Sequence, residues 1–84
     1  MGSKTYDGVW FTSYSHDHPP PHVHAEIGGI ELVIDLLPGG KVARSQRTND
    51  VKPLNAKRSD IRRILRVAAA HVDELHALWE KTHG

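Results

Sequence analysis

Two adjacent glycines, Gly28 and Gly29, constrain the fold of this chain more than any other feature. The residues before them, 22–27, read HVHAEI, in which polar and apolar side chains alternate as in a half-buried β-strand. The residues after them, 30–37, read IELVIDLL and are apolar and β-branched enough to form a central strand. Because a two-residue turn needs positive φ at both positions, the glycine pair predicts a tight antiparallel hairpin.

The hairpin also predicts which side chains face each other. With the two glycines as the turn, His22 lies opposite Asp35 and His24 lies opposite Val33. Directly opposed side chains have their Cβ atoms about 4.5–5.5 Å apart. We therefore expect His22, His24 and Asp35 on one face, where the carboxylate can fix the tautomer of an imidazole.

The remaining segments predict an α+β fold in a single domain, residues 1–84. The aromatic stretch Val9–Phe11 predicts a first strand, and residues 41–47 predict a weaker fourth strand. We expect three to four antiparallel strands over about residues 8–47, followed by a polar loop at 48–55.

The last third of the chain predicts one long helix over about residues 56–81, packed on the sheet. Its apolar side chains fall on one broad stripe: Ile61, Ile64, Leu65, Ala68, Val72, Leu75, Leu78 and Trp79. At 1.5 Å per residue, such a helix is longer than a small sheet. A kink or a break near Ala70 and His71 is therefore compatible with the pattern.

The composition limits what this chain can be. Its 84 residues are only 38% hydrophobic, so the core is thin, and a metal ion, a partner protein or a homodimer interface would supplement it. The absence of cysteine excludes disulfides, thiolate metal sites and cysteine nucleophiles. The sequence holds no run of about 18 apolar residues, so we expect no membrane span and a cytoplasmic protein.

Charge is distributed unevenly along the chain. Residues 41–70 carry nine lysines and arginines against two aspartates, whereas the segments on either side are acidic. Such a basic segment is typical of a surface for RNA, DNA or an acidic partner, and the candidate contacts are Arg44, Arg58, Arg62 and Arg66. The alternative is a solvated helix face on which charges cluster by chance.

Residues 15–26 read SHDHPPPHVHAE and concentrate four histidines and two carboxylates around three prolines. Imidazole nitrogens and carboxylate oxygens are ligands for Zn²⁺, Mn²⁺ and Ni²⁺. The candidate metal ligands are therefore Asp17, His18, His22 and His24. The alternative is a stiff connector in which these residues have no chemical role.

The same cluster could instead act by acid–base catalysis, and its candidate residues are His22, His24, Asp35 and His71. His71 belongs to this set because it falls on the apolar stripe of the helix and points toward whatever the helix covers. If the helix covers the His22 face, the three imidazoles converge. If it covers the opposite face, His71 is a core histidine.

These residues also carry a resemblance. The stretch YSHDHPPPHVHAEIGGIELVIDL resembles the opening of small bacterial and archaeal proteins grouped as domain of unknown function 4160. The later stretch AAAHVDELHALWEK is similar to the closing helix of that family. The matching motif positions are Asp17, His18, Pro20, His22, His24, Glu31, Asp35, His71, Glu74 and Trp79. This sequence departs from the pattern at Val23, where an aromatic residue is usual, and at Ala69, where tryptophan is frequent.

The resemblance implies a stand-alone protein of a two-gene, toxin–antitoxin-like module that binds a partner protein, with nucleic acid as a further expected partner. The residues themselves keep a second hypothesis open, a compact histidine-based or metal-dependent hydrolase of RNA or another phosphodiester. In that hypothesis His22 and His24 bind metal or transfer protons, and the arginines contact phosphate.

Overall fold

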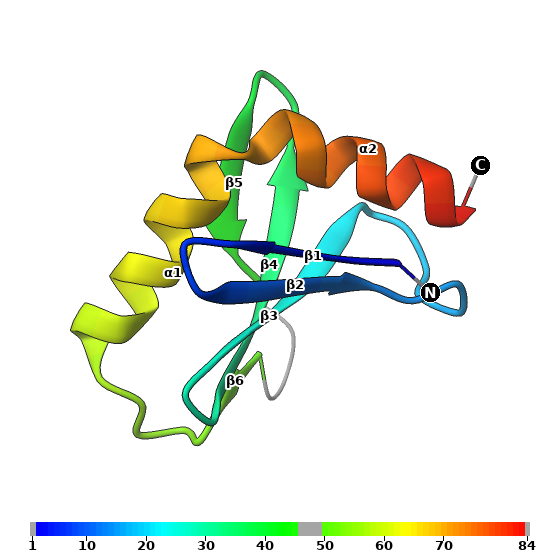
Figure 1. Cartoon of the computed structure of the whole chain (residues 1–84). Helices are drawn as coiled ribbons and strands as arrows, with labels where there is room; N and C mark the ends of the chain where they lie inside the picture. Colours follow the sequence, from blue (N-terminus) through cyan, green and yellow to red (C-terminus); the bar gives the residue numbers. More distant parts are fainter. Residues whose placement is uncertain (1, 46–49, 84) are drawn as a thin grey trace.

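A computed structural model describes residues 2–45 and 50–83, and its strands form one antiparallel sheet (Figure 1). The strands are β1 (Gly2–Tyr6), β2 (Val9–Ser13), β3 (His22–Ile27), β4 (Ile30–Leu37), β5 (Lys41–Arg44) and the short β6 (Val51–Lys52). The first five are neighbours in chain order, and β6 pairs with β4. The predicted α+β class is confirmed, but the sheet has more strands than the three to four expected.

The β3–β4 hairpin has the predicted register. His22 pairs with Asp35, and His24 pairs with Val33. The turn residues Gly28 and Gly29 have φ values of 54° and 84°, a region that side chains disfavour. The glycine turn and the pairing of the two strands are therefore as the sequence predicted.

Two strands were missed by the sequence pattern. β1 is polar and largely exposed, and it forms because it pairs with β2 and because Gly2 approaches α2 closely. A Cβ atom at Gly2 would lie 2.8 Å from Leu78 Cδ1. β6 falls inside the predicted 48–55 loop, where Val51 pairs with Leu32 and is buried. The predicted strand and loop positions 46–49 lie outside the described residues.

The prediction of one long helix is wrong, because the C-terminal region forms two helices, α1 (Arg58–Ala70) and α2 (Val72–His83). They separate at His71, within the position where the sequence allowed a break. A straight helix over both would be about 39 Å long, whereas the longest extent of the Cα trace is 34 Å. The break lets α1 pack on β5 and β4 while α2 crosses β1 and β2 (Figure 1).

The helices cover the sheet face that carries Val23 and Ala25, which settles the question that periodicity left open. Phe11, Leu32 and Ile34 share that face by register and are also buried. The helices contribute most of the predicted stripe to the core, namely Ile61, Ile64, Ala68, Val72, Leu75, Leu78 and Trp79. Leu65 is only partly buried, and Val67, which the stripe did not include, is buried instead. Neither helix is long and apolar enough to cross a membrane, within the part of the chain that the structure describes.

Candidate metal centre

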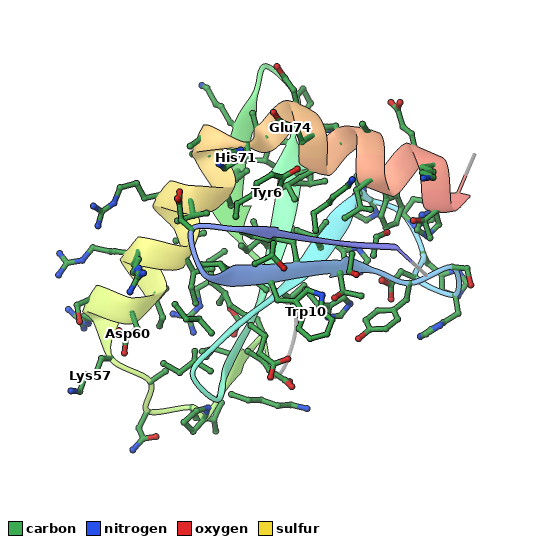
Figure 2. All side chains as sticks on the ribbon, viewed as in Figure 1. Tyr6, Trp10, Lys57, Asp60, His71 and Glu74 are labelled. Atoms are coloured by element: carbon green, nitrogen blue, oxygen red, sulfur yellow. The ribbon has the colours of Figure 1, made fainter. Side chains whose placement is uncertain are left out.

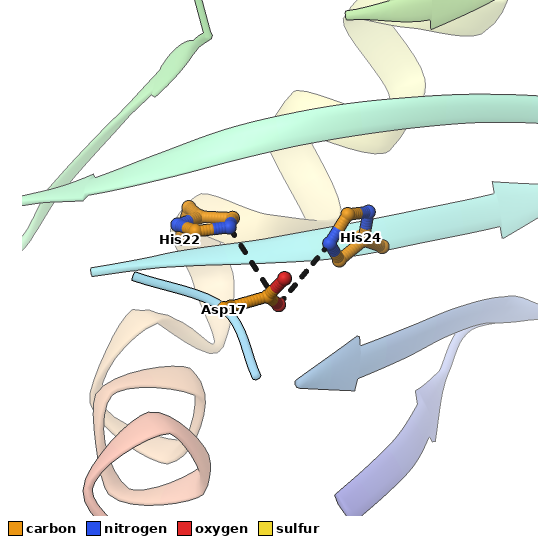
Figure 3. Close-up of side chains that lie close together, drawn as sticks. All are labelled: Asp17, His22 and His24. Atoms are coloured by element: carbon orange, nitrogen blue, oxygen red, sulfur yellow. Dashed lines mark hydrogen bonds and ion pairs between the residues drawn. The ribbon is translucent and has the colours of Figure 1, made fainter. Parts of the chain in front are cut away.

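Asp17, His22 and His24 meet at the start of β3 (Figure 3). The Nε2 atom of His24 lies 3.2 Å from Asp17 Oδ2, and the Nε2 atom of His22 lies 3.6 Å from the same oxygen. One ligand atom from each of the three residues lies within 4.8 Å of the other two. The two histidines come from β3, and Asp17 comes from the segment between β2 and β3.

The Asp17 side chain is held by a turn that starts at Tyr14. The Asp17 N–H donates to the Tyr14 carbonyl at 3.1 Å, and Asp17 Oδ2 accepts from the Tyr14 N–H at 3.3 Å. The Tyr14 ring also meets the His24 ring edge to face, with centroids 5.0 Å apart. Only 11% of the Asp17 side chain is exposed, so this carboxylate is directed inward toward the histidines.

The orientation of His22 is fixed by the proline segment. Its Nδ1 atom lies 2.9 Å from the carbonyl oxygen of Pro20, which can only accept, so Nδ1 carries the hydrogen. In the neutral ring this places the lone pair on Nε2, the atom that faces Asp17. A hydrogen bond from the second ring nitrogen to a backbone carbonyl is the arrangement usual for metal-binding histidines. The ring is 2% exposed and lies 5.2 Å from the Trp79 ring.

The three donors fit a divalent transition metal. With metal–ligand distances of about 2.0–2.2 Å, neighbouring ligand atoms stand roughly 3–3.5 Å apart, close to the separations seen around Asp17 Oδ2. When His22 is neutral, its Nε2 lone pair and the Asp17 carboxylate both face the space between them, an arrangement that a cation would satisfy. Three protein ligands are also the number typical of catalytic zinc sites, which keep one position for water or substrate.

The last turn of α2 supports this cluster, a contribution that the sequence reasoning missed. His83 Nε2 lies 2.9 Å from the Asp17 carbonyl oxygen, and His83 Nδ1 lies 2.9 Å from that of Trp79. A carbonyl oxygen only accepts, so His83 makes both hydrogen bonds when both of its ring nitrogens carry a hydrogen. The ring also stacks on Trp79 with centroids 3.6 Å apart. The i, i+4 spacing of Trp79 and His83 was the available signal.

Other predicted site residues lie elsewhere. His18 is exposed, and it does not belong to the group of close ligand atoms. Asp35 lies opposite His22 as expected, but the Nδ1 hydrogen bond of His22 goes to Pro20. The Oδ1 atom of Asp35 is buried and makes no hydrogen bond among the described residues. Sequence alone could not show that a backbone carbonyl would take the orienting role.

His71 does not join the histidines of β3. It stacks on Tyr6 with ring centroids 3.9 Å apart and an interplanar angle of 9° (Figure 2). Its Nδ1 atom lies 3.9 Å from a carboxylate oxygen of Glu74. His71 thus packs against β1 at the break between the helices, on the covered side of the sheet.

A hollow of about 180 Å³ adjoins the metal centre at His24. It opens on the sheet face opposite the one that carries Val23, and its polar lining residues are Thr12, Tyr14, His24, Glu26, Glu31, Asp50 and Lys52. Trp10, whose side chain is exposed, pairs with Glu26 beside this hollow. Of the three donors, His24 is therefore the one that this hollow reaches.

The four predicted arginine contacts lie together, away from the three metal ligands. Arg44, Arg58 and Arg62 line one hollow, and Arg62 and Arg66 line the next. Arg44 also donates from Nε to Asp50 Oδ2 at 2.5 Å. This hydrogen bond raises the pKa of Arg44 above its usual value, and the attraction of the two charges adds to the effect while desolvation opposes it.

An antiparallel sheet with two helices on one face, and with two histidines and a carboxylate at the start of β3, defines a small α+β protein with a candidate metal centre. The family model described as "Domain of unknown function (DUF4160)" matches residues 8–80, so the chain belongs to this family. No curated protein and no solved structure matches the chain.

Proposed function

We propose that this protein is a metal-dependent hydrolase whose centre is formed by Asp17, His22 and His24. The observation that carries the proposal is the convergence of these three donors within 4.8 Å, with His22 oriented by a backbone carbonyl. A bound divalent metal supplies Lewis acidity and makes water a stronger acid at neutral pH. The roles of the chain are to hold the ion through two imidazoles, to offset its charge with Asp17 and to admit substrate through the hollow beside His24.

Nitrogen donors decide which metals suit this centre. Two imidazoles and one carboxylate favour Zn²⁺ or Ni²⁺ over Mn²⁺, which binds such sites more weakly. RNA or another phosphodiester is the substrate class that we propose. Its support is Asp50, which lines the hollow beside His24 and also binds Arg44, so this one arginine lies next to that hollow.

The metal content of the purified protein tests this proposal. The protein is prepared without a metal-affinity column, incubated with each ion, desalted and analysed by plasma mass spectrometry. We expect one ion per chain in the wild type and loss of the ion in His22→Ala, His24→Ala and Asp17→Asn. His18→Ala is the matched control, because this neighbouring histidine is exposed and outside the cluster. Full metal content in all three site variants would show that these residues do not form a metal centre.

Hydrolysis is tested separately from binding. A fluorescent RNA oligonucleotide is incubated with the metal-loaded wild type and with the same variants. Cleavage that depends on metal and disappears in His24→Ala supports the proposal. Equal rates in the wild type and the site variants would show that the activity comes from a contaminant or from another site.

A second candidate function is a cytoplasmic interaction protein of a bacterial two-gene, toxin–antitoxin-like module, acting on a partner protein or as a homodimer. The arginines on α1 and β5 favour this candidate, because they line two hollows that none of the three metal ligands lines. The test is co-expression with the product of the neighbouring small gene, followed by sedimentation analysis of the 9.4-kDa chain. If the chain sediments as a monomer both alone and after co-expression, it forms neither a homodimer nor a stable complex with that product.

A further inference from the structure

The strongest unassigned feature outside the metal centre is the row of arginines on α1. Arg58, Arg62 and Arg66 repeat every four residues and therefore lie along one flank of the helix, over about 12 Å. Arg58 and Arg62 line a hollow of about 370 Å³ together with Arg44 of β5. Arg62 and Arg66 line an adjoining hollow of about 670 Å³. We call these four residues the arginine surface.

Few carboxylates oppose this charge. Among the described residues, Arg58, Arg62 and Arg66 form no ion pair, whereas Arg44 is paired with Asp50. Asp60 lies two residues from Arg58 and from Arg62, about 200° around the helix from each, so it belongs to another flank. The surface therefore presents three exposed guanidinium groups without a partner from the described part of the chain.

The shape of the surface indicates an extended anion. Both hollows are shallow and lie between a helix and the neighbouring strand β5, and all four arginines are exposed. A guanidinium binds phosphate through two parallel hydrogen bonds, and its charge persists at all physiological pH values. Regularly spaced guanidinium groups on a helix flank suit a chain of phosphates better than a single small ligand.

We propose that the arginine surface binds the phosphate backbone of a nucleic acid. We expect this binding to be independent of base sequence, because contacts to phosphates carry no sequence information. The proposal names the nucleic-acid contact of the functions proposed above, but it requires no metal. Arg44 contributes a fourth contact only when it exchanges Asp50 for a phosphate.

Salt dependence of binding gives a quantitative test. Affinities for labelled 16-residue RNA, single-stranded DNA and duplex DNA are measured by fluorescence anisotropy, in EDTA, between 50 and 200 mM salt. Each neutralised phosphate contributes about −0.9 to the slope of log K against log salt for duplex DNA. Three contacts predict a slope of about −2.7, which corresponds to roughly a 40-fold loss of affinity over this range. The RNA and DNA arms show which nucleic acid is preferred.

Variants then assign the slope to residues. Arg62→Ala should reduce the magnitude of the salt slope by about one unit, and Arg62→Lys should preserve the slope. Asp50→Asn, which releases Arg44, should increase its magnitude by a similar amount. Arg63→Ala is the matched control, because Arg63 has the same charge on the same helix but lies outside both hollows. Circular dichroism confirms that each variant is folded.

Two results would overturn the proposal. One is an equal effect of Arg62→Ala and Arg63→Ala, which would show that only net charge matters. The other is binding of polyglutamate but of no nucleic acid, which would assign the surface to an acidic protein. Because the assay contains EDTA, a failure of the metal centre leaves these outcomes unchanged, and the two proposals fail separately.

Discussion

Replacement of Asp17 by alanine should destabilise this fold even without metal. The Asp17 carboxylate is mostly buried and accepts hydrogen bonds from the Tyr14 N–H and from His24 Nε2. Alanine removes both bonds. Asparagine keeps one acceptor oxygen in nearly the same place but removes the charge.

The size of the effect follows from the two bonds. A hydrogen bond to a charged group contributes about 1.5–3 kcal/mol to stability, and the lengths of 3.3 and 3.2 Å place both at the weak end of that range. Asp17→Ala should therefore lower the free energy of unfolding by about 3 kcal/mol. For a domain of this size, that is a fall in Tm of roughly 12–24 °C. Asp17→Asn should lower the free energy of unfolding by about half as much, because hydrogen bonds between neutral groups are weaker.

The assay is thermal denaturation followed by circular dichroism, in EDTA so that no metal contributes. Glu80→Ala serves as the control, since Glu80 is an exposed carboxylate near the C-terminal end of α2. It should move Tm by less than about 4 °C. If Asp17→Ala has the same Tm as Glu80→Ala, the Asp17 hydrogen bonds contribute nothing to the stability of the fold and the reasoning fails.

Three further predictions concern metal, core and turn. Zn²⁺ at 100 times its Kd should add about 2.7 kcal/mol to stability and raise Tm by roughly 11–22 °C. EDTA should reverse that rise, and a Tm insensitive to Zn²⁺, Ni²⁺ and Mn²⁺ would contradict the centre. Leu75→Ala should lower the free energy of unfolding by about 2–5 kcal/mol in urea titrations, because Leu75 is 0% exposed, whereas Leu54→Ala, at 77% exposed, should have little effect. Gly29→Ala should lower the free energy of unfolding by about 1–2 kcal/mol because of the backbone strain at a φ of 84°. A Cβ atom there meets nothing within 4 Å, so no clash adds to this effect. An unchanged free energy of unfolding would show that the turn changes its geometry.

Local patterns predicted a large part of this fold. The glycine turn, the alternation in residues 22–27 and the helical stripe depend on neighbours within a few residues, and all three are confirmed. β1 and β6 could not be predicted in this way. β1 has a polar sequence, and β6 has only two residues, so both exist through pairing with strands already in place.

The candidate site divides in the same way. Its two histidines are neighbours on one strand face, and period-two geometry placed them together. The third donor was among the candidates, but its selection over His18 depends on the turn at Tyr14. The sequence predicted that Asp35 would orient His22, but the carbonyl of Pro20 does so instead. This outcome also depends on the path of the backbone before β3.

By itself, the sequence determined the hairpin register, the apolar stripe of the C-terminal region and the direction shared by His22 and His24. These follow from backbone periodicity and from the φ values that glycine allows. Only the tertiary structure decided which sheet face the helices cover, that His71 stacks on Tyr6, and that His83 reaches Asp17 from 66 residues away. Those outcomes depend on how the whole core packs, because a helix stripe fits either face of a sheet until burial of Phe11, Val23 and Ile34 selects one.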